Sequence, residues 1–132
     1  MSSFLRVASS LVLGVAAAAY VQPVLAADAA AGKAVFQAQC ALCHSAAPND
    51  GGGAQGPSLQ GVVGRKAASV ADYKYSEAMA AKGAEGLVWT EENLAAYLPN
   101  PKAFVPKTKM AFAGLKKPED VANVIAFLKA HP

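Results

Sequence analysis

The spacing of apolar residues predicts one amphipathic helix near each end of residues 27–132. In the C-terminal helix, which begins at Pro118, the apolar stripe follows the i, i+3, i+4, i+7 rule: Val121, Val124, Ile125 and Leu128. The first helix, before residue 40, has one side formed by Gly32, Val35, Phe36 and Gln39. Because Gly32 has no side chain, the backbone there can come close to the turn at residues 124–127. We therefore expect these two helices to pack against each other.

Capping residues predict two shorter helices between them. Ser76 is expected to be the N-cap of a helix that Gly83 ends. Thr90 is expected to be the N-cap of a helix that runs to Leu98, where the sequence Pro-Asn-Pro at 99–101 ends it. No segment alternates convincingly as a strand, and no internal repeat is present. The pattern therefore predicts an all-α fold of short helices.

The first 26 residues have the pattern of a secretory signal peptide. A short segment with one positive charge, 1–6, precedes an apolar stretch, 11–21, and Val24-Leu25-Ala26 offers small residues at the cleavage positions. The alternative is a retained membrane anchor, because residues 7–27 are uncharged over a membrane-spanning length. Gln22-Pro23 interrupts that stretch where a spanning helix should finish. Cleavage after Ala26, export to the periplasm and a mature domain of residues 27–132 are therefore predicted.

Composition narrows the class of protein further. The chain has 132 residues, a length typical of one domain, with 16% charged residues and a net charge of +3. So small a charge, with 8% aromatic residues, does not support nucleic-acid binding. Residues 27–132 are poor in Leu, Ile, Val and Phe, near the boundary at which chains fail to fold. The clear helical patterns then predict a large apolar body supplied from outside the chain.

The two cysteines indicate what that body is. Cys40 and Cys43, in the sequence Cys-Ala-Leu-Cys-His, are followed at once by His44. A disulfide across so short a loop would constrain the unfolded chain very little, and a thioredoxin-like pair would follow a strand rather than a helix. Zinc would need two further ligands, and only His131 remains as a histidine. Cys-x-x-Cys-His is the attachment signature of c-type haem, in which the adjacent imidazole reaches the iron.

The iron needs a second ligand, or it stays open to small molecules. Outside the leader the candidates are Met79, Met110, His131 and several lysines. Met79 lies in a predicted helix, where methionine more often fills the core. Met110 lies in a predicted loop, 106–114, bounded by Pro and Gly, which can present a side chain across a flat ligand. A thioether across from histidine stabilises ferrous iron and raises the reduction potential, so Met110 is favoured.

The chain resembles class I c-type cytochromes, close to mitochondrial cytochrome c and its soluble bacterial periplasmic relatives. Besides the haem-attachment motif, the resemblance rests on segments in the same order along nearly all of the mature chain: Gly32-Lys33, Gly56-Pro57-Ser58-Leu59, Gly64-Arg65-Lys66, Tyr73-Lys74-Tyr75-Ser76, Trp89, Tyr97-Leu98, Pro101-Lys102 and 106–114. It implies short helices wrapped around one covalently attached haem c, with the first and last helices packed together.

The resemblance also implies roles for residues around the haem. His44 and Met110 would be the axial iron ligands, and the Pro57 carbonyl would accept a hydrogen bond from the other nitrogen of His44, fixing the ring. Tyr97 would point toward the Met110 sulfur. Four side chains would donate to the haem propionates: Arg65, Tyr75, Trp89 and Thr108. For Trp89 and Tyr97, ordinary core packing is the simpler alternative.

The sequence departs from the family pattern in three places. Met79 stands where the mitochondrial proteins have an asparagine near the haem. The segment 84–87 lengthens the turn before Trp89, and the loop 45–55 is slightly long and rich in glycine. These differences bear on the reduction potential, while the expected ligand set is unchanged.

These features predict a soluble one-electron carrier, not an enzyme. Iron held by His and Met has no vacant position for oxygen or peroxide, and no acid, base or nucleophile constellation accompanies it. Two alternatives stay open: a haem enzyme or gas-binding protein in which Met110 is displaceable, and a membrane-anchored electron-transfer subunit that keeps its leader.

The resemblance also predicts the partners. The protein is expected to be a monomer. Relatives dock on acidic patches of quinol-cytochrome c reductases, terminal oxidases or photosynthetic reaction centres. Five lysines in or near the segment that carries Met110 could form the docking patch: Lys102, Lys107, Lys109, Lys116 and Lys117. From composition alone they would be separate solvated side chains.

Overall fold

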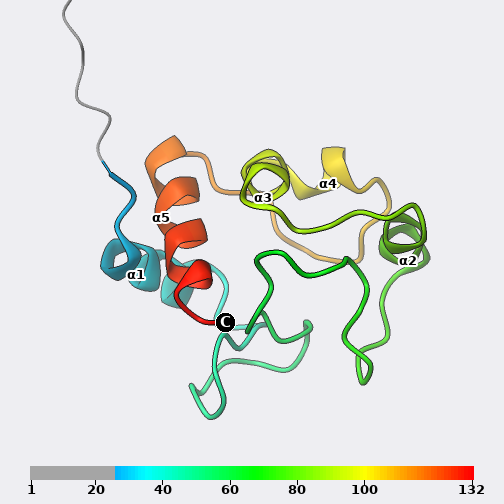
Figure 1. Cartoon of the computed structure of the whole chain (residues 1–132), viewed down its shortest axis with the longest axis horizontal. Helices are drawn as coiled ribbons and strands as arrows, with labels where there is room; N and C mark the ends of the chain where they lie inside the picture. Colours follow the sequence, from blue (N-terminus) through cyan, green and yellow to red (C-terminus); the bar gives the residue numbers. More distant parts are fainter. Residues whose placement is uncertain (1–25) are drawn as a thin grey trace, which may run out of the picture.

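The computed structural model describes residues 26–132, which contain five helices joined by long loops (Figure 1). The helices are α1 (Ala29–Gln39), α2 (Glu77–Ala84), α3 (Glu91–Tyr97), α4 (Pro101–Phe104) and α5 (Pro118–Lys129). Within the described residues, β pairing is limited to one isolated bridge between Lys66 and Val88. None of the helices in residues 26–132 is long and apolar enough to cross a bilayer. The expected signal peptide lies, except for Ala26, outside the described residues.

The N-terminal caps of α2 and α3 are those predicted from the sequence. Ser76 Oγ accepts a hydrogen bond from the Met79 backbone N–H (3.1 Å), and Thr90 Oγ1 accepts one from that of Asn93 (3.1 Å). Each hydroxyl satisfies a backbone donor that the first helical turn leaves without a partner. Pro118 begins α5, as expected for a residue that has no N–H to place.

One expectation about helix ends is wrong, and one short helix is not predicted. Gly83 does not stop α2, which continues to Ala84. A Cβ at Gly83 would lie 2.4 Å from the Ala67 carbonyl oxygen, so this glycine allows close packing rather than ending the helix. The short helix α4 is not predicted either. Asn100 caps it, its Oδ1 accepting from Ala103 N–H (3.2 Å), and Pro101 occupies the first turn, so the Pro-Asn-Pro sequence both follows α3 and starts α4.

The expected packing of the first and last helices is confirmed. Figure 1 shows α1 crossing α5 at one end of the molecule. A Cβ at Gly32 would lie 1.9 Å from the Asn123 carbonyl oxygen, so only glycine allows this approach. Beside it, the rings of Phe36 and Phe127 have centroids 5.1 Å apart.

Apolar burial is concentrated at this end of the fold. Most of the well-buried large side chains come from α1, α3, α5 and the residues beside them: Phe36, Leu94, Leu98, Val105, Leu115, Val121, Val124, Ile125, Phe127 and Leu128. The helix α2, at the other end in Figure 1, has one buried residue, the glycine Gly83. The long loops 40–76 and 105–117 therefore depend on something other than helix packing to be held in place.

Candidate functional site

The haem-attachment motif forms the turn that continues α1. Cys40 is the C-cap of the helix, and its backbone N–H donates to the Phe36 carbonyl (2.8 Å). The Cys40 carbonyl then accepts from the backbone N–H groups of both Cys43 (3.0 Å) and His44 (2.9 Å). One helical turn therefore holds two thiols and an imidazole side by side. Burial raises the pKa of the Cys40 thiol to about 11, with a smaller contribution from Cys43, so this thiol is protonated at neutral pH.

The other interpretations of the two cysteines find no support in the described residues. Both thiols are free rather than joined in a disulfide. No group of three or more His, Cys, Asp or Glu side chains in residues 26–132 is arranged to hold a metal ion. His131 lies elsewhere, where its Nδ1 hydrogen-bonds with the Phe127 carbonyl (2.7 Å) and its ring packs on Phe127.

The His44 ring is fixed by its neighbours. Its Nδ1 lies 2.8 Å from the Pro57 carbonyl oxygen. Because a carbonyl can only accept, Nδ1 carries a proton, and in the neutral ring Nε2 is the nitrogen with the free lone pair. A Cβ at Gly56 would lie 2.2 Å from the ring carbon Cε1, so the backbone at residue 56 touches the ring. The imidazole is therefore oriented by a hydrogen bond and by contact with a glycine.

The side chain of Met110 comes from a loop far along the chain. The Tyr97 hydroxyl lies 3.6 Å from Met110 Sδ, within hydrogen-bonding range for sulfur. Tyr97 is itself held between Trp89 and Phe104, at ring-centroid distances of 4.8 and 5.7 Å. Burial raises the pKa of Tyr97 to about 12, so its hydroxyl is protonated and can donate to the sulfur.

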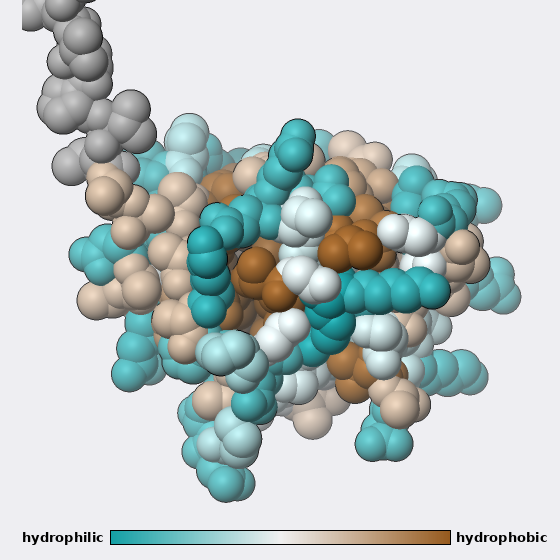
Figure 2. Space-filling view, in the orientation of Figure 1, coloured by the Kyte–Doolittle hydropathy of each residue, from teal (hydrophilic) through white to brown (hydrophobic). Residues whose placement is uncertain are grey.

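One cavity of about 520 Å³ brings together all ten site residues that the sequence predicts. They are Cys40, Cys43, His44, Pro57, Arg65, Tyr75, Trp89, Tyr97, Thr108 and Met110. Met79 also lines the cavity, whereas His131 does not. On the face seen in Figure 2, apolar groups lie recessed in the middle and hydrophilic side chains surround them. Residues from distant parts of the chain therefore enclose one largely apolar space.

Polar side chains on the cavity wall are held by the backbone around them. Arg65 donates to the carbonyls of Gln60 (2.7 Å) and Ser58 (2.8 Å), and burial lowers the pKa of its guanidinium. The Tyr75 hydroxyl accepts from Val70 N–H (3.2 Å) and keeps its own proton to donate. Thr108 Oγ1 accepts from Met110 N–H (3.2 Å). Arginine has five N–H donors, so Arg65 retains donors for an anionic group in the cavity.

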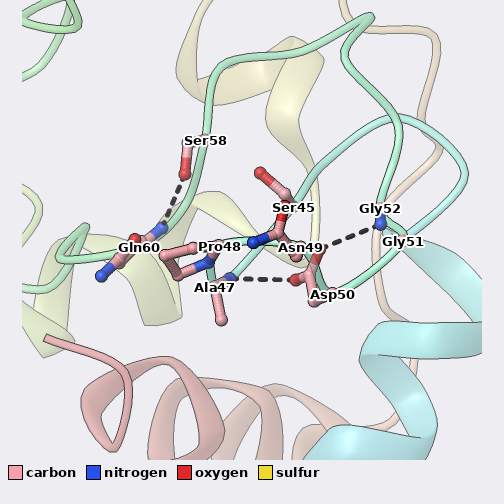
Figure 3. A pocket seen from close by; sticks show the side chains of 9 residues that line it. All are labelled: Ser45, Ala47, Pro48, Asn49, Asp50, Gly51, Gly52, Ser58 and Gln60. Carbon is pink, nitrogen blue, oxygen red and sulfur yellow. Dashed lines mark hydrogen bonds between the residues drawn. The ribbon is translucent and has the colours of Figure 1, made fainter.

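A second hollow has a different character. Figure 3 shows it lined by residues 45 and 47–52 with Ser58 and Gln60. There Asp50 accepts hydrogen bonds from the backbone N–H groups of Ala46 (2.6 Å), Ala47 (2.9 Å) and Gly52 (2.9 Å), which lower the pKa of its carboxyl. Asp50 thus holds the glycine-rich loop together, and none of the predicted site residues lines this hollow.

Sequence reasoning missed several residues at the site. It assigned no role to Gly56, although the motif Gly-Pro-Ser-Leu contained the signal, or to Tyr73 and Gln55, which also line the cavity. Of the five lysines expected at the docking patch, Lys109 is the one that lines the cavity. Lys116 Nζ instead donates to the backbone carbonyl of Ala113 (2.7 Å).

The residues present fit a covalently attached haem. The cavity is within the size range of cofactor sites, and its walls are mostly apolar. The two free thiols and the Nε2 lone pair of His44 lie on one turn at its edge, and a thioether is available from Met110. These are the donors that a c-type haem takes from a protein.

Comparison with known proteins gives one family. The family model described as cytochrome c covers residues 29–132. Cytochrome c2 of Afifella marina is 53% identical over 103 residues, covering 76% of this chain and 79% of the relative. Cytochrome c of Guizotia abyssinica is 45% identical over 105 residues, covering 80% of this chain and 91% of the relative. The crystal structure of a cytochrome c2 mutant superimposes with a TM-score of 0.65 and 41% identity, covering 75% of this chain and 96% of that one.

Proposed function

This chain belongs to the cytochrome c family, and from that premise we propose that it is a soluble one-electron carrier whose haem iron is bound by His44 and Met110. Members of the family carry covalently attached haem c and transfer electrons, and this chain is likewise an electron-transfer protein rather than an enzyme. The bound haem supplies a one-electron couple between ferrous and ferric iron.

The observation that carries the ligand assignment is the shared cavity. His44, from the turn after α1, and Met110, from the loop 106–114, line the same space although they lie far apart in sequence. Cys40 and Cys43 would form the two thioether bonds to the haem on the turn that holds His44. Met79 is the other methionine at the cavity, and its place in α2 favours packing over ligation.

Neighbouring residues hold these ligands in place without reacting themselves. Pro57 accepts from His44 Nδ1, which fixes the ring and would leave Nε2 to bind the iron. Tyr97 donates to the Met110 sulfur and limits its rotation. Four residues line the cavity with donors for the haem propionates: Arg65, Tyr75, Trp89 and Thr108. Fixed ligands suit electron transfer, because little rearrangement accompanies a change of oxidation state.

A spectrum of the holoprotein tests this assignment. The ferric protein is expected to show the far-red absorption band of methionine-ligated haem at neutral pH, and the reduced protein is expected not to bind carbon monoxide readily. Both results follow if Met110 occupies the sixth position. A missing band together with ready carbon monoxide binding would instead support a haem enzyme or gas-binding protein with a displaceable methionine.

The leader and the bacterial relative support a proposal for the cellular compartment. We propose that residues 1–26 direct export and are removed, so that the mature chain works in the periplasm. Intact mass measurement of the purified protein, with cell fractionation, distinguishes this arrangement from a subunit anchored by a retained leader.

We also propose that a lysine patch guides docking on membrane redox complexes: quinol-cytochrome c reductase, a terminal oxidase or a photosynthetic reaction centre. Lys102, Lys107 and Lys117 are exposed and free to meet an acidic partner surface. Lys109 and Lys116 donate to nearby backbone carbonyls, so they contribute charge from fixed positions. Such charges speed encounter, and salt weakens their effect.

Neutralising two of the exposed lysines is expected to slow association with quinol-cytochrome c reductase. Lys107→Gln with Lys117→Gln should reduce the association rate at low salt by about threefold, and the difference should vanish at high salt. The matched control is Lys82→Gln, in α2, whose Nζ pairs with Glu85 at 3.4 Å. Equal rates for the double variant and the control at low salt would exclude these lysines from the docking patch.

A further inference from the structure

The loop that carries Met110 has few backbone hydrogen bonds. Within the described part of the chain, the backbone N–H groups of residues 106–114 make two hydrogen bonds: Thr108 to the Val105 carbonyl (3.1 Å) and Met110 to Thr108 Oγ1 (3.2 Å). Both partners belong to the loop or to the residue just before it. The loop's own backbone therefore does little to hold Met110 over the cavity, and side chains must do so.

Lys109, the neighbour of Met110, ties the loop to a distant segment. Its Nζ donates to the Lys74 backbone carbonyl, 35 residues earlier in the chain. The same ammonium lies 4.6 Å from the centroid of the Tyr73 ring, within the range of a cation–π interaction. One side chain therefore makes two contacts with the segment 73–74.

Tyr73 is in turn fixed on its other side. Its hydroxyl donates to the Gln55 carbonyl (3.0 Å), and its ring packs edge-on against Tyr75 at 4.8 Å between centroids. Gln55, Tyr73 and Lys109 all line the cavity. Three loop segments that share no regular secondary structure are thus joined at the cavity's edge through two side chains.

We propose that Lys109 and Tyr73 form a clasp that keeps the Met110 loop closed, and so sets how often Met110 leaves the iron. The clasp acts through Met110 and rests on the proposed ligation by that residue. Lys109 and Tyr73 are positioning residues, because they touch the loop and its neighbours rather than the reacting atoms. The Tyr97 hydroxyl restrains the sulfur itself, whereas the clasp restrains the backbone that presents it.

The clasp predicts a faster opening of the loop when either side chain is removed. Lys109→Met keeps the length of the side chain but loses its charge and donors. Tyr73→Leu loses the ring and the hydroxyl. Each change removes a cation–π contact together with a hydrogen bond, and because these contacts hold the closed loop, their loss corresponds to roughly tenfold faster opening.

Binding of imidazole to the ferric holoprotein measures this opening. Imidazole can reach the iron only when Met110 leaves, so at saturating imidazole the observed rate equals the rate of loop opening. Lys109→Met and Tyr73→Leu are each expected to raise that rate by about tenfold. Lys109→Arg, which keeps the charge, should open at the wild-type rate. The matched control is Lys107→Met, which removes the same charge from an exposed side chain of the same loop.

Coupling between the two residues separates a clasp from general destabilisation. The double variant Lys109→Met with Tyr73→Leu should raise the opening rate by less than the product of the two single effects, because the cation–π contact is lost in both single variants and can be lost only once. Single variants that bind imidazole as slowly as Lys107→Met would overturn the clasp, and so would fully additive effects.

The same samples keep the clasp distinct from the ligand assignment. A wild-type protein without the far-red methionine band overturns ligation by Met110 and, with it, the role of the clasp. A protein that shows the band, but whose clasp variants open at the control rate, overturns the clasp alone.

Discussion

Replacing Met110 with alanine is expected to leave the haem attached while opening the iron to added ligands. Cys40, Cys43 and His44 lie on a separate turn and do not depend on the loop 106–114 for their position. The variant should lose the far-red absorption band, and its reduced form should bind carbon monoxide. Its reduction potential should fall by about 100 mV or more, within the roughly 0.8 V that axial ligands span, because a thioether favours ferrous iron.

Met79→Leu is the matched control for this substitution. It removes the other thioether from the same cavity while keeping a side chain of similar size. The control should keep the far-red band and stay closed to carbon monoxide. An unchanged spectrum in Met110→Ala, or loss of the band in Met79→Leu, would contradict the ligand assignment.

Replacing both cysteines with alanine is expected to prevent a stable protein from accumulating. Without the thioether bonds, the cavity of about 520 Å³ is no longer reliably filled. At about 24 cal/mol for each Å³ of enclosed empty volume, 520 Å³ sets an upper limit of about 12 kcal/mol, because the cavity is open on one side and water can enter it. That is as large as the whole free energy of unfolding of a typical domain, roughly 5–15 kcal/mol. The long loops 40–76 and 105–117 should lose their order first, since the helix packing lies elsewhere.

Far-UV circular dichroism and the yield of exported protein measure this effect. The variant Cys40→Ala with Cys43→Ala should show reduced helix content and no cooperative thermal transition. Cys40→Ala alone, which keeps one thioether bond, is the matched control and should accumulate with haem. A well-folded double variant without haem would contradict the inference that residues 27–132 lack a sufficient core of their own.

Local signals in the sequence predicted much of the helical structure. Ser76 and Thr90 cap α2 and α3 because a hydroxyl on the residue just before a helix can reach the backbone N–H groups of its first turn. The role of Gly83 was predicted wrongly because it depends on a contact that is not local. Glycine often follows the end of a helix, which is why the sequence suggested that role. The reason for this glycine is instead its contact with Ala67, 16 residues earlier in the chain, and no residue near Gly83 indicates that contact.

The residues of the candidate site also fall into those that local sequence predicts and those that only the tertiary structure brings together. The sequence by itself determined the haem-attachment turn, because two thiols and an imidazole within five residues fall on one helical turn whatever the rest of the chain does. It also determined that α1 and α5 carry matching faces. Only the tertiary structure decided that both methionines reach the cavity, and that Lys109 meets Tyr73 and Lys74. Those contacts join segments tens of residues apart through loops without regular structure, and no local periodicity encodes how such loops close.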